Sequence, residues 1–296
     1  HAHTQVAEYL GIPLRYYDRM AQEEPGLLLA NANRWLEKAG NEQRLVRTLD
    51  HRVRAVLSDR YRPLDNMDLL EAVVPTLQRV GAKVVSSEAT ELRLYIETVL
   101  EERQGEVRPG DVVRAGIAIS NSEVGAGSLR VEPLLYRLVC RNGAIAKESR
   151  LRAFHLGGAA GGDSDGVRSF MRTETRQAAD RAFFLKVRDV VEATFAGDLF
   201  AGMLDSARQA AGQPIERPLA EVVEVTTTRL ALPEGLREPI LETLARDGDL
   251  SRWGLVNAVT AQAHKSEQYE ANIDLQRAGG SILEWSAAEW AKVAMN

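Results

Sequence analysis

The chain has 296 residues, of which 45% are hydrophobic and 27% are charged, and its net charge is −5. This length suits one large domain or two ordinary ones, with enough apolar material for a core that needs no disulfides. Cys140 is the only cysteine, which excludes an internal disulfide and a cysteine-based zinc site and favours the reducing cytoplasm. Because no apolar stretch approaches the ~20 residues of a membrane span, we expect a cytoplasmic protein without a membrane partner. The chain begins with His1 rather than methionine, so we expect residues upstream to be missing.

Charge is unevenly distributed along the chain. Residues 127–188 hold twelve Lys and Arg against six Asp and Glu, a balance of +6. Residues 189–296 hold nine against seventeen, a balance of −8, and residues 1–126 hold sixteen against nineteen, a balance of −3. A basic middle joined to an acidic final third suggests a polyanionic partner, although an ordinary solvated surface gives the same count.

The chain is predicted to begin with helices. Two short helices are expected within residues 4–20, because Gly11 can end the first and Pro13 suits the start of the second. Helical spacing of apolar residues predicts a third helix over Pro25–Lys38.

A change of period then predicts a hairpin. Residues 44–49 and 52–57 are expected to be strands, with Asp50 and His51 as a tight turn between them. A helix capped by Asp65 or Asn66 is expected to follow.

Four further strands are predicted as a meander, over residues 91–100, 112–120, 129–140 and 144–156. The dipeptide Asn142-Gly143 is the strongest hairpin signal in the chain, so we expect the turn before the last strand there.

A glycine-rich loop over residues 157–166 is expected to lead into a long helix over residues 167–195. The remainder is expected to be helical, with breaks that include Gly279-Gly280.

This order predicts an α+β fold with N-terminal helices, an antiparallel β-meander packed on a long helix, and a helical C-terminal region. We divide the chain into an N-terminal helical segment (residues 1–40), an α+β core (41–195) and a helical C-terminal region (196–296).

Arginines recur at spacings that place them on shared faces, two apart on strands and four apart on the long helix. Guanidinium groups pair well with phosphate oxygens, so these arginines predict a groove for a nucleic-acid backbone. The candidate binding residues are Arg52, Arg54, Arg137, Arg141, Arg150, Arg152, Arg168, Arg172 and Arg176. Tyr95, Tyr136 and Phe154 lie near them and could stack on bases. The alternative is that the arginines face solvent or pair with Glu132, Glu148, Glu174 and Asp180.

The sequence contains no recognisable catalytic motif. The glycine-rich loop fits neither the phosphate-binding loop nor the dinucleotide fingerprint, and the histidines form no metal-binding pattern. Asp163 and Asp165 provide too few ligands for a divalent cation. We therefore expect no enzyme activity, no catalytic residues, no cofactor and no metal.

Three stretches together resemble a family of uncharacterised phage- and plasmid-like proteins, domain of unknown function 932. They are residues 58–66, residues 138–143 and residues 253–260, and the region around Gly11 and Pro13 is also similar. The resemblance implies a mobile-element context and no catalytic residues.

The order of elements from residue 91 to residue 195 is also similar to the core of single-strand annealing recombinases of the RecT/Erf type. That likeness implies single-stranded DNA as partner, a homo-oligomer, and strand annealing without nucleotide hydrolysis. Three alternatives stay open. They are an oligomeric structural or host-interaction phage protein, a regulator that reads duplex DNA with residues 4–20, and an enzyme of unseen type.

Overall fold

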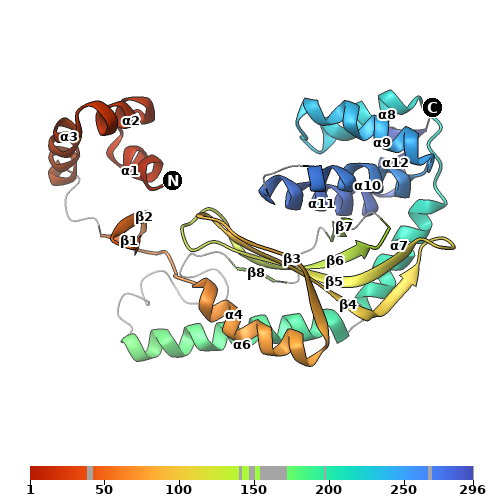
Figure 1. The fold of residues 1–296 in the computed structure, drawn as a ribbon, viewed down its shortest axis with the longest axis horizontal. Coiled ribbons are helices and arrows are strands. Elements are labelled where there is room, and N and C mark those ends of the chain that lie inside the picture. Colours follow the sequence, from red (N-terminus) through yellow and green to blue (C-terminus); the bar gives the residue numbers. More distant parts are fainter. Residues whose placement is uncertain are drawn as a thin grey trace.

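The computed structural model describes residues 1–38, 43–139, 142–146, 151–153, 172–196, 198–265 and 269–295. For residues 151–153, Arg176, Ala196, His264 and Lys265 it describes the backbone alone. A six-stranded antiparallel sheet lies between two groups of helices, and three N-terminal helices lie at one end of the molecule (Figure 1). The predicted α+β class, with N-terminal helices, a meander on a long helix and a helical C-terminal region, is confirmed. No helix in the described part of the chain combines the length and the apolar character needed to cross a bilayer.

The N-terminal helices form where the sequence predicts them. They are α1 (Ala2–Leu10), α2 (Leu14–Glu23) and α3 (Pro25–Lys38). Gly11 ends α1 in the left-handed conformation (φ 64°), which glycine adopts without strain. A small cluster that includes Leu10, Tyr17 and Met20 holds α1 and α2 together.

The predicted hairpin is confirmed as β1 (Arg44–Leu49) and β2 (Arg52–Ser58). Its turn residues Asp50 and His51 both have positive φ, 49° and 63°, as a two-residue turn that matches the strand twist requires. Helix α1 packs against β2, where the backbone N–H of Val56 donates to the side chain of Gln5.

The sheet contains one strand that the sequence did not predict. Its strands are β3 (Ala82–Ala89), β4 (Leu94–Glu106), β5 (Val112–Asn121), β6 (Leu129–Arg137), β7 (Asn142–Ile145) and β8 (Leu151–Ala153). The unpredicted strand is β3, which follows helix α4 (Asn66–Arg79) and pairs with β4 along one side only. As an edge strand it is largely exposed, and it lacks the apolar alternation that marks a half-buried strand. Its register shifts between Val84 and Ser86, which marks a β-bulge on this edge.

Within the last predicted strand, over residues 144–156, the structure describes the end of β7 and the whole of β8, and both strands pair with β6. The expected turn at Asn142-Gly143 is wrong, because both residues lie inside β7, opposite Arg137 and Tyr136. Asn142 is buried, and its amide donates to the Thr260 hydroxyl at 2.5 Å. A tertiary contact therefore determines the position of this dipeptide, rather than its turn propensity.

Helices cover both faces of the sheet (Figure 1). Helices α4 and α6 (Thr173–Ala196) pack on one face through an apolar cluster that includes Ile117, Phe183 and Val187. The C-terminal helices form the other layer and the larger core, in which Trp253 is 1% exposed. They are α7 (Leu199–Ala211), α8 (Leu219–Arg229), α9 (Arg237–Asp247), α10 (Arg252–Thr260), α11 (Tyr269–Leu283) and α12 (Ala287–Ala294), with short 3₁₀ turns η1 (Glu234–Leu236) and η2 (Ala261–Lys265).

The predicted break at Gly279-Gly280 is wrong, because α11 continues through both glycines. A Cβ atom on Gly280 would lie 1.7 Å from the carbonyl oxygen of Ile145 in β7. The glycines thus let helix and strand approach closely instead of ending the helix.

Candidate nucleic-acid interface

Two arginine positions lie side by side on the neighbouring strands β6 and β8. Arg152 on β8 is directly opposite Arg130 on β6 in the antiparallel register. The Arg130 side chain is 26% exposed and lies 3.6 Å from Glu132, which is 3% exposed. Glu132 also receives the Arg277 guanidinium of α11, at 2.6 Å. The register thus brings a second arginine position of the basic segment opposite Arg130, which makes the β6–β8 edge the candidate anion site.

Arg52 and Arg54 do not share a face as predicted. Thr48 of β1 pairs with Val53 whereas Arg47 pairs with Ala55, so Arg54 is the extra residue of a β-bulge. Arg52 is exposed beside the hairpin turn and makes no ion pair with a described residue. Arg54 forms an ion pair with Glu123 at 2.8 Å, with its side chain 16% exposed, and it is therefore already occupied.

Arg137 also binds a carboxylate of the protein itself. Its Nε donates to Oδ1 of Asp111 at 2.6 Å, and the other oxygen of Asp111 accepts from the Trp253 indole at 2.8 Å. The side chains of Arg137 and Asp111 are 17% and 13% exposed. Arg137 therefore helps to join the sheet to the C-terminal helices, which makes it a poor candidate for phosphate binding.

The predicted arginine stripe on the long helix is only partly present in the described chain. Helix α6 begins at Thr173, later than predicted, so Arg172 is exposed just before the helix and only Arg176 lies within it. Arg141, Arg150 and Arg168 lie outside the described residues, as does the glycine-rich loop over 157–166.

Of the predicted stacking residues, Tyr95 is buried and so is not presented to solvent. Tyr95 is 1% exposed and packs against Tyr269, with ring centroids 4.9 Å apart. Tyr136 is only partly exposed, and Phe154 lies outside the described residues. Tyr95 therefore belongs to the contact between sheet and α11.

Sequence reasoning also missed arginines that pair with carboxylates where the sheet meets α11. Arg93, just before β4, lies 3.5 Å from Glu270 of α11, and Arg277 of α11 binds Glu132 of β6. Arg130 has the same parity as Glu132 and Tyr136 along the predicted strand, and that alternation could have identified it.

A buried carboxyl lies between the sheet and α11. Glu97 is 4% exposed, and its Oε1 accepts a hydrogen bond from the Gln276 amide at 3.0 Å. Burial raises the pKa of Glu97, whereas hydrogen bonds from Gln276 and Tyr269 oppose that rise in part. Oε1 of Gln276 has no hydrogen-bond partner among the described residues.

Glu97→Gln is expected to become increasingly stabilising, relative to the original chain, as pH rises. Because the pKa of Glu97 is raised in the folded state, the folded chain keeps a proton that the unfolded chain has lost, so stability falls as pH rises through this window. Urea unfolding of both chains between about pH 5 and pH 8 would check this, since the difference in unfolding free energy should grow with pH. If the difference in unfolding free energy stays constant with pH, Glu97 does not cause the loss of stability.

No group of three or more histidine, cysteine and acidic side chains within the described ranges is arranged to hold a metal ion. Asp163 and Asp165 lie outside those ranges.

Residues 53–280 match the family described as Domain of unknown function (DUF932). The chain belongs to this family. No curated protein matches the chain, and no solved structure matches it either. Membership in DUF932 confirms the resemblance carried by the three sequence stretches, whereas the likeness to annealing recombinases stays a prediction.

Two of the stretches that resemble DUF932 meet in the fold. Asn142, from the second stretch, donates to the Thr260 hydroxyl and to the carbonyl of Asn257, both from the third. Within the third stretch, the indole of Trp253 donates to Asp111, and a Cβ on Gly254 would lie 1.7 Å from the carbonyl oxygen of Asp249. These residues therefore fix the C-terminal helices on the sheet.

The first stretch connects the hairpin to the core in the same way. The Tyr61 hydroxyl donates to the carbonyl of Ser122, and Arg62 donates to Asp180 of α6 at 2.8 Å. Leu64 is fully buried. The residues named here from the three stretches thus have structural roles in joining the parts of the fold.

Proposed function

We propose that this DUF932 protein binds single-stranded DNA in a phage- or plasmid-like context, and that it anneals complementary strands without nucleotide hydrolysis. The observation that carries the proposal is the pair of opposed arginine positions, Arg130 and Arg152, at the β6–β8 edge. They belong to residues 127–188, in which twelve Lys and Arg face six Asp and Glu.

Two of those six acidic residues are already bound by arginines from outside the segment. Glu132 pairs with Arg277 and Asp180 pairs with Arg62. Two arginines of the segment, Arg137 and Arg188, are in turn paired with Asp111 and Asp189 from outside it, so the surplus of +6 is unchanged by these pairs. Arg172, one of the twelve, is exposed, and Arg52 of the hairpin is exposed outside the segment. A surplus of this kind favours a phosphate backbone, and binding through it weakens with salt.

Arg150→Ala with Arg152→Ala is expected to weaken binding to a labelled single-stranded oligonucleotide by roughly tenfold or more at low salt. The slope of log affinity against log salt should fall by about 0.7 for each phosphate that the variant no longer neutralises. Fluorescence anisotropy across a salt series measures both quantities, and duplex DNA in a parallel series tests strand preference. Arg150 is included in this variant on the evidence of its spacing in the sequence, because it lies outside the described residues.

The matched control is Arg208→Ala with Arg246→Ala, which removes the same charge from exposed positions on α7 and α9. Its affinity should stay within about twofold of the original chain. If both double variants lose the same affinity, net charge alone explains the loss. If Arg150→Ala with Arg152→Ala binds as tightly as the original chain, the β6–β8 edge is not the binding site. Site-specific duplex binding would favour the regulator instead.

One observation favours a second candidate, an oligomeric structural or host-interaction protein without nucleic-acid affinity. Helix α3 has no buried residue, although it carries Leu27, Leu29, Trp35 and Leu36. A helix of this composition needs a partner, and absence of binding to either DNA form at low salt would select this candidate.

A further inference from the structure

The hairpin of β1 and β2 is apolar on both of its faces. One face carries Ala55 and Leu57, which are buried in a cluster with Val124. The other, which we call the outer face, carries Val46 and Val53, and these side chains are 49% and 50% exposed. An antiparallel pair with one covered face usually turns polar side chains to water on the other. The outer face is therefore suited to a binding partner.

The strand register gathers these valines into one patch. Val46 is opposite Val56, and two residues further along β1 Thr48 is opposite Val53. Residues directly opposite each other on antiparallel strands share a face, as do residues two apart on one strand. The four side chains thus form a continuous, largely apolar surface on the hairpin.

The charges on and beside the outer face suit a polyanion. Arg44 has the same parity along β1 as Val46 and is exposed, and it is opposite Ser58, so no acidic residue stands on this face. Arg52 is exposed next to the turn and makes no ion pair with a described residue. Asp50, in the turn, is the one acidic residue of the hairpin. Two exposed arginines therefore stand against one exposed carboxylate.

The hairpin lies at the same end of the six-stranded sheet as the candidate anion site. The segment between β5 and β6 joins the two. Val124 of this segment packs with Leu57 of β2, and Ser128, at its end, accepts a hydrogen bond from Nε of Arg130 at 3.2 Å. Arg130 is in turn opposite Arg152 on β8. A nucleic-acid backbone bound at the β6–β8 edge is therefore close to an apolar surface that can cover its bases.

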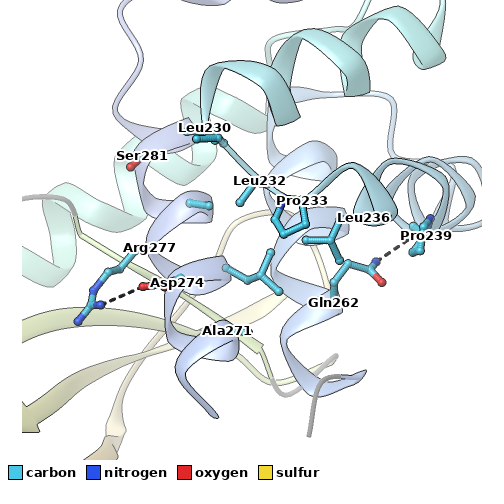
Figure 2. A pocket seen from close by; sticks show the side chains of 14 residues that line it. Leu230, Leu232, Pro233, Leu236, Pro239, Gln262, Ala271, Asp274, Arg277 and Ser281 are labelled. Atoms are coloured by element: carbon cyan, nitrogen blue, oxygen red, sulfur yellow. Dashed lines mark hydrogen bonds and ion pairs between the residues drawn. The ribbon is translucent and has the colours of Figure 1, made fainter. Parts of the chain in front are cut away.

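A second apolar surface is less suited to nucleic acid. It is a pocket of about 740 Å³ between the chain around η1 and helix α11 (Figure 2). Two charged residues line it, Asp274 and Arg277, and they pair with each other at 3.2 Å. The pocket therefore has no net charge to attract a polyanion. It also lies on the C-terminal helices, away from the hairpin (Figure 1).

We propose that the outer face of the hairpin covers unstacked bases of the single strand whose backbone is bound at the β6–β8 edge. This inference rests on the proposed function and adds a base contact to it. Unstacked bases expose the faces of their rings to water, so packing them on valines removes apolar area from water. Bases in a duplex are already stacked, so the contact favours single strands over duplex DNA.

Val46→Thr with Val53→Thr tests the base contact. Threonine suits a strand, but a base packed on its hydroxyl would leave that group without a hydrogen-bond partner. The affinity for labelled oligothymidine should therefore fall by about tenfold at low salt. An abasic oligonucleotide of the same length offers the same backbone without bases, so its affinity should stay within about twofold. Fluorescence anisotropy measures both affinities.

Val84→Thr with Val85→Thr is the matched control. It makes the same substitutions on edge strand β3, where the two valines are 58% and 39% exposed, and it should leave both affinities unchanged. Circular dichroism of each variant verifies its fold. Val46→Ile with Val53→Ile enlarges the apolar face and keeps the test decisive if the threonine variant unfolds. It should bind oligothymidine at least as tightly as the original chain.

The outcomes separate this inference from the proposed function. If the original chain binds both strands equally, or if the threonine variant keeps its affinity for oligothymidine, the base contact is wrong and the backbone contact stands. Weaker binding of oligothymidine by the isoleucine variant would also overturn the base contact. An original chain that binds neither strand would remove both proposals. If the threonine substitutions instead abolish self-association of the DNA-free chain, the outer face is an interface between copies.

Discussion

Replacing Arg277 by alanine is expected to lower the free energy of unfolding by about 3–5 kcal/mol. The Arg277 guanidinium donates to both oxygens of Glu132, at 3.1 Å and 2.6 Å, in a fork that matches the carboxylate. Glu132 is 3% exposed, so its carboxylate would stay buried after the substitution. Its remaining partner would be Arg130, at 3.6 Å. Urea unfolding at neutral pH measures the loss.

Asp274→Ala is the matched control. Asp274 also pairs with Arg277, at 3.2 Å, but its side chain is 72% exposed, so its removal should change stability by about 0.5 kcal/mol or less. Exchanging Arg277 and Glu132 together for apolar residues of similar volume should restore much of the loss. A loss below about 1 kcal/mol for Arg277→Ala would contradict a buried ion pair between α11 and the sheet.

Gly280→Ala is expected to destabilise the fold by about 2–3 kcal/mol, although alanine is the better helix former. The added Cβ would lie 1.7 Å from the carbonyl oxygen of Ile145, so α11 and β7 would have to separate. That movement would also strain the Asn142–Thr260 hydrogen bond beside it. Thermal unfolding followed by circular dichroism would report the change.

Gly202→Ala on α7 makes the same substitution where nothing lies within 4 Å of the new Cβ. It should stabilise the chain by about 0.5–1 kcal/mol, because alanine loses less backbone entropy than glycine in a helix. If Gly280→Ala lowers stability and Gly202→Ala raises it, close packing explains the effect at Gly280. Changes in stability of the same sign would contradict that explanation.

Local signals explain which elements could be predicted. Asp50 and His51 between two alternating runs predict the hairpin, because the turn depends on adjacent residues. Gly11 predicts the end of α1 for the same reason. By contrast β3 is an exposed edge strand, so burial imposes no pattern on its sequence. The dipeptide at 142–143 was misplaced because its partners on α10 are more than a hundred residues away.

The candidate site was harder to predict than the fold for a related reason. Spacing indicates where arginines stand on an element, but their carboxylate partners come from elsewhere. Arg54 pairs with Glu123 and Arg137 pairs with Asp111, and neither pairing follows from strand periodicity. The bulge at Arg54 reverses the parity on which the shared face depended. Two of the predicted positions do lie at the margin of a sheet: Arg52 is beside the hairpin turn, and Arg152 is on the edge strand β8.

The two edges of the sheet limit how the molecule can aggregate. On β3 the bulge next to exposed Val84 and Val85 interrupts the straight row of backbone groups that an incoming strand would need. At the opposite edge, β7 and β8 are four and three residues long, too short to template a continuous ladder. Growth of the six-stranded sheet by strand addition, as in amyloid, is therefore disfavoured at both of its described edges.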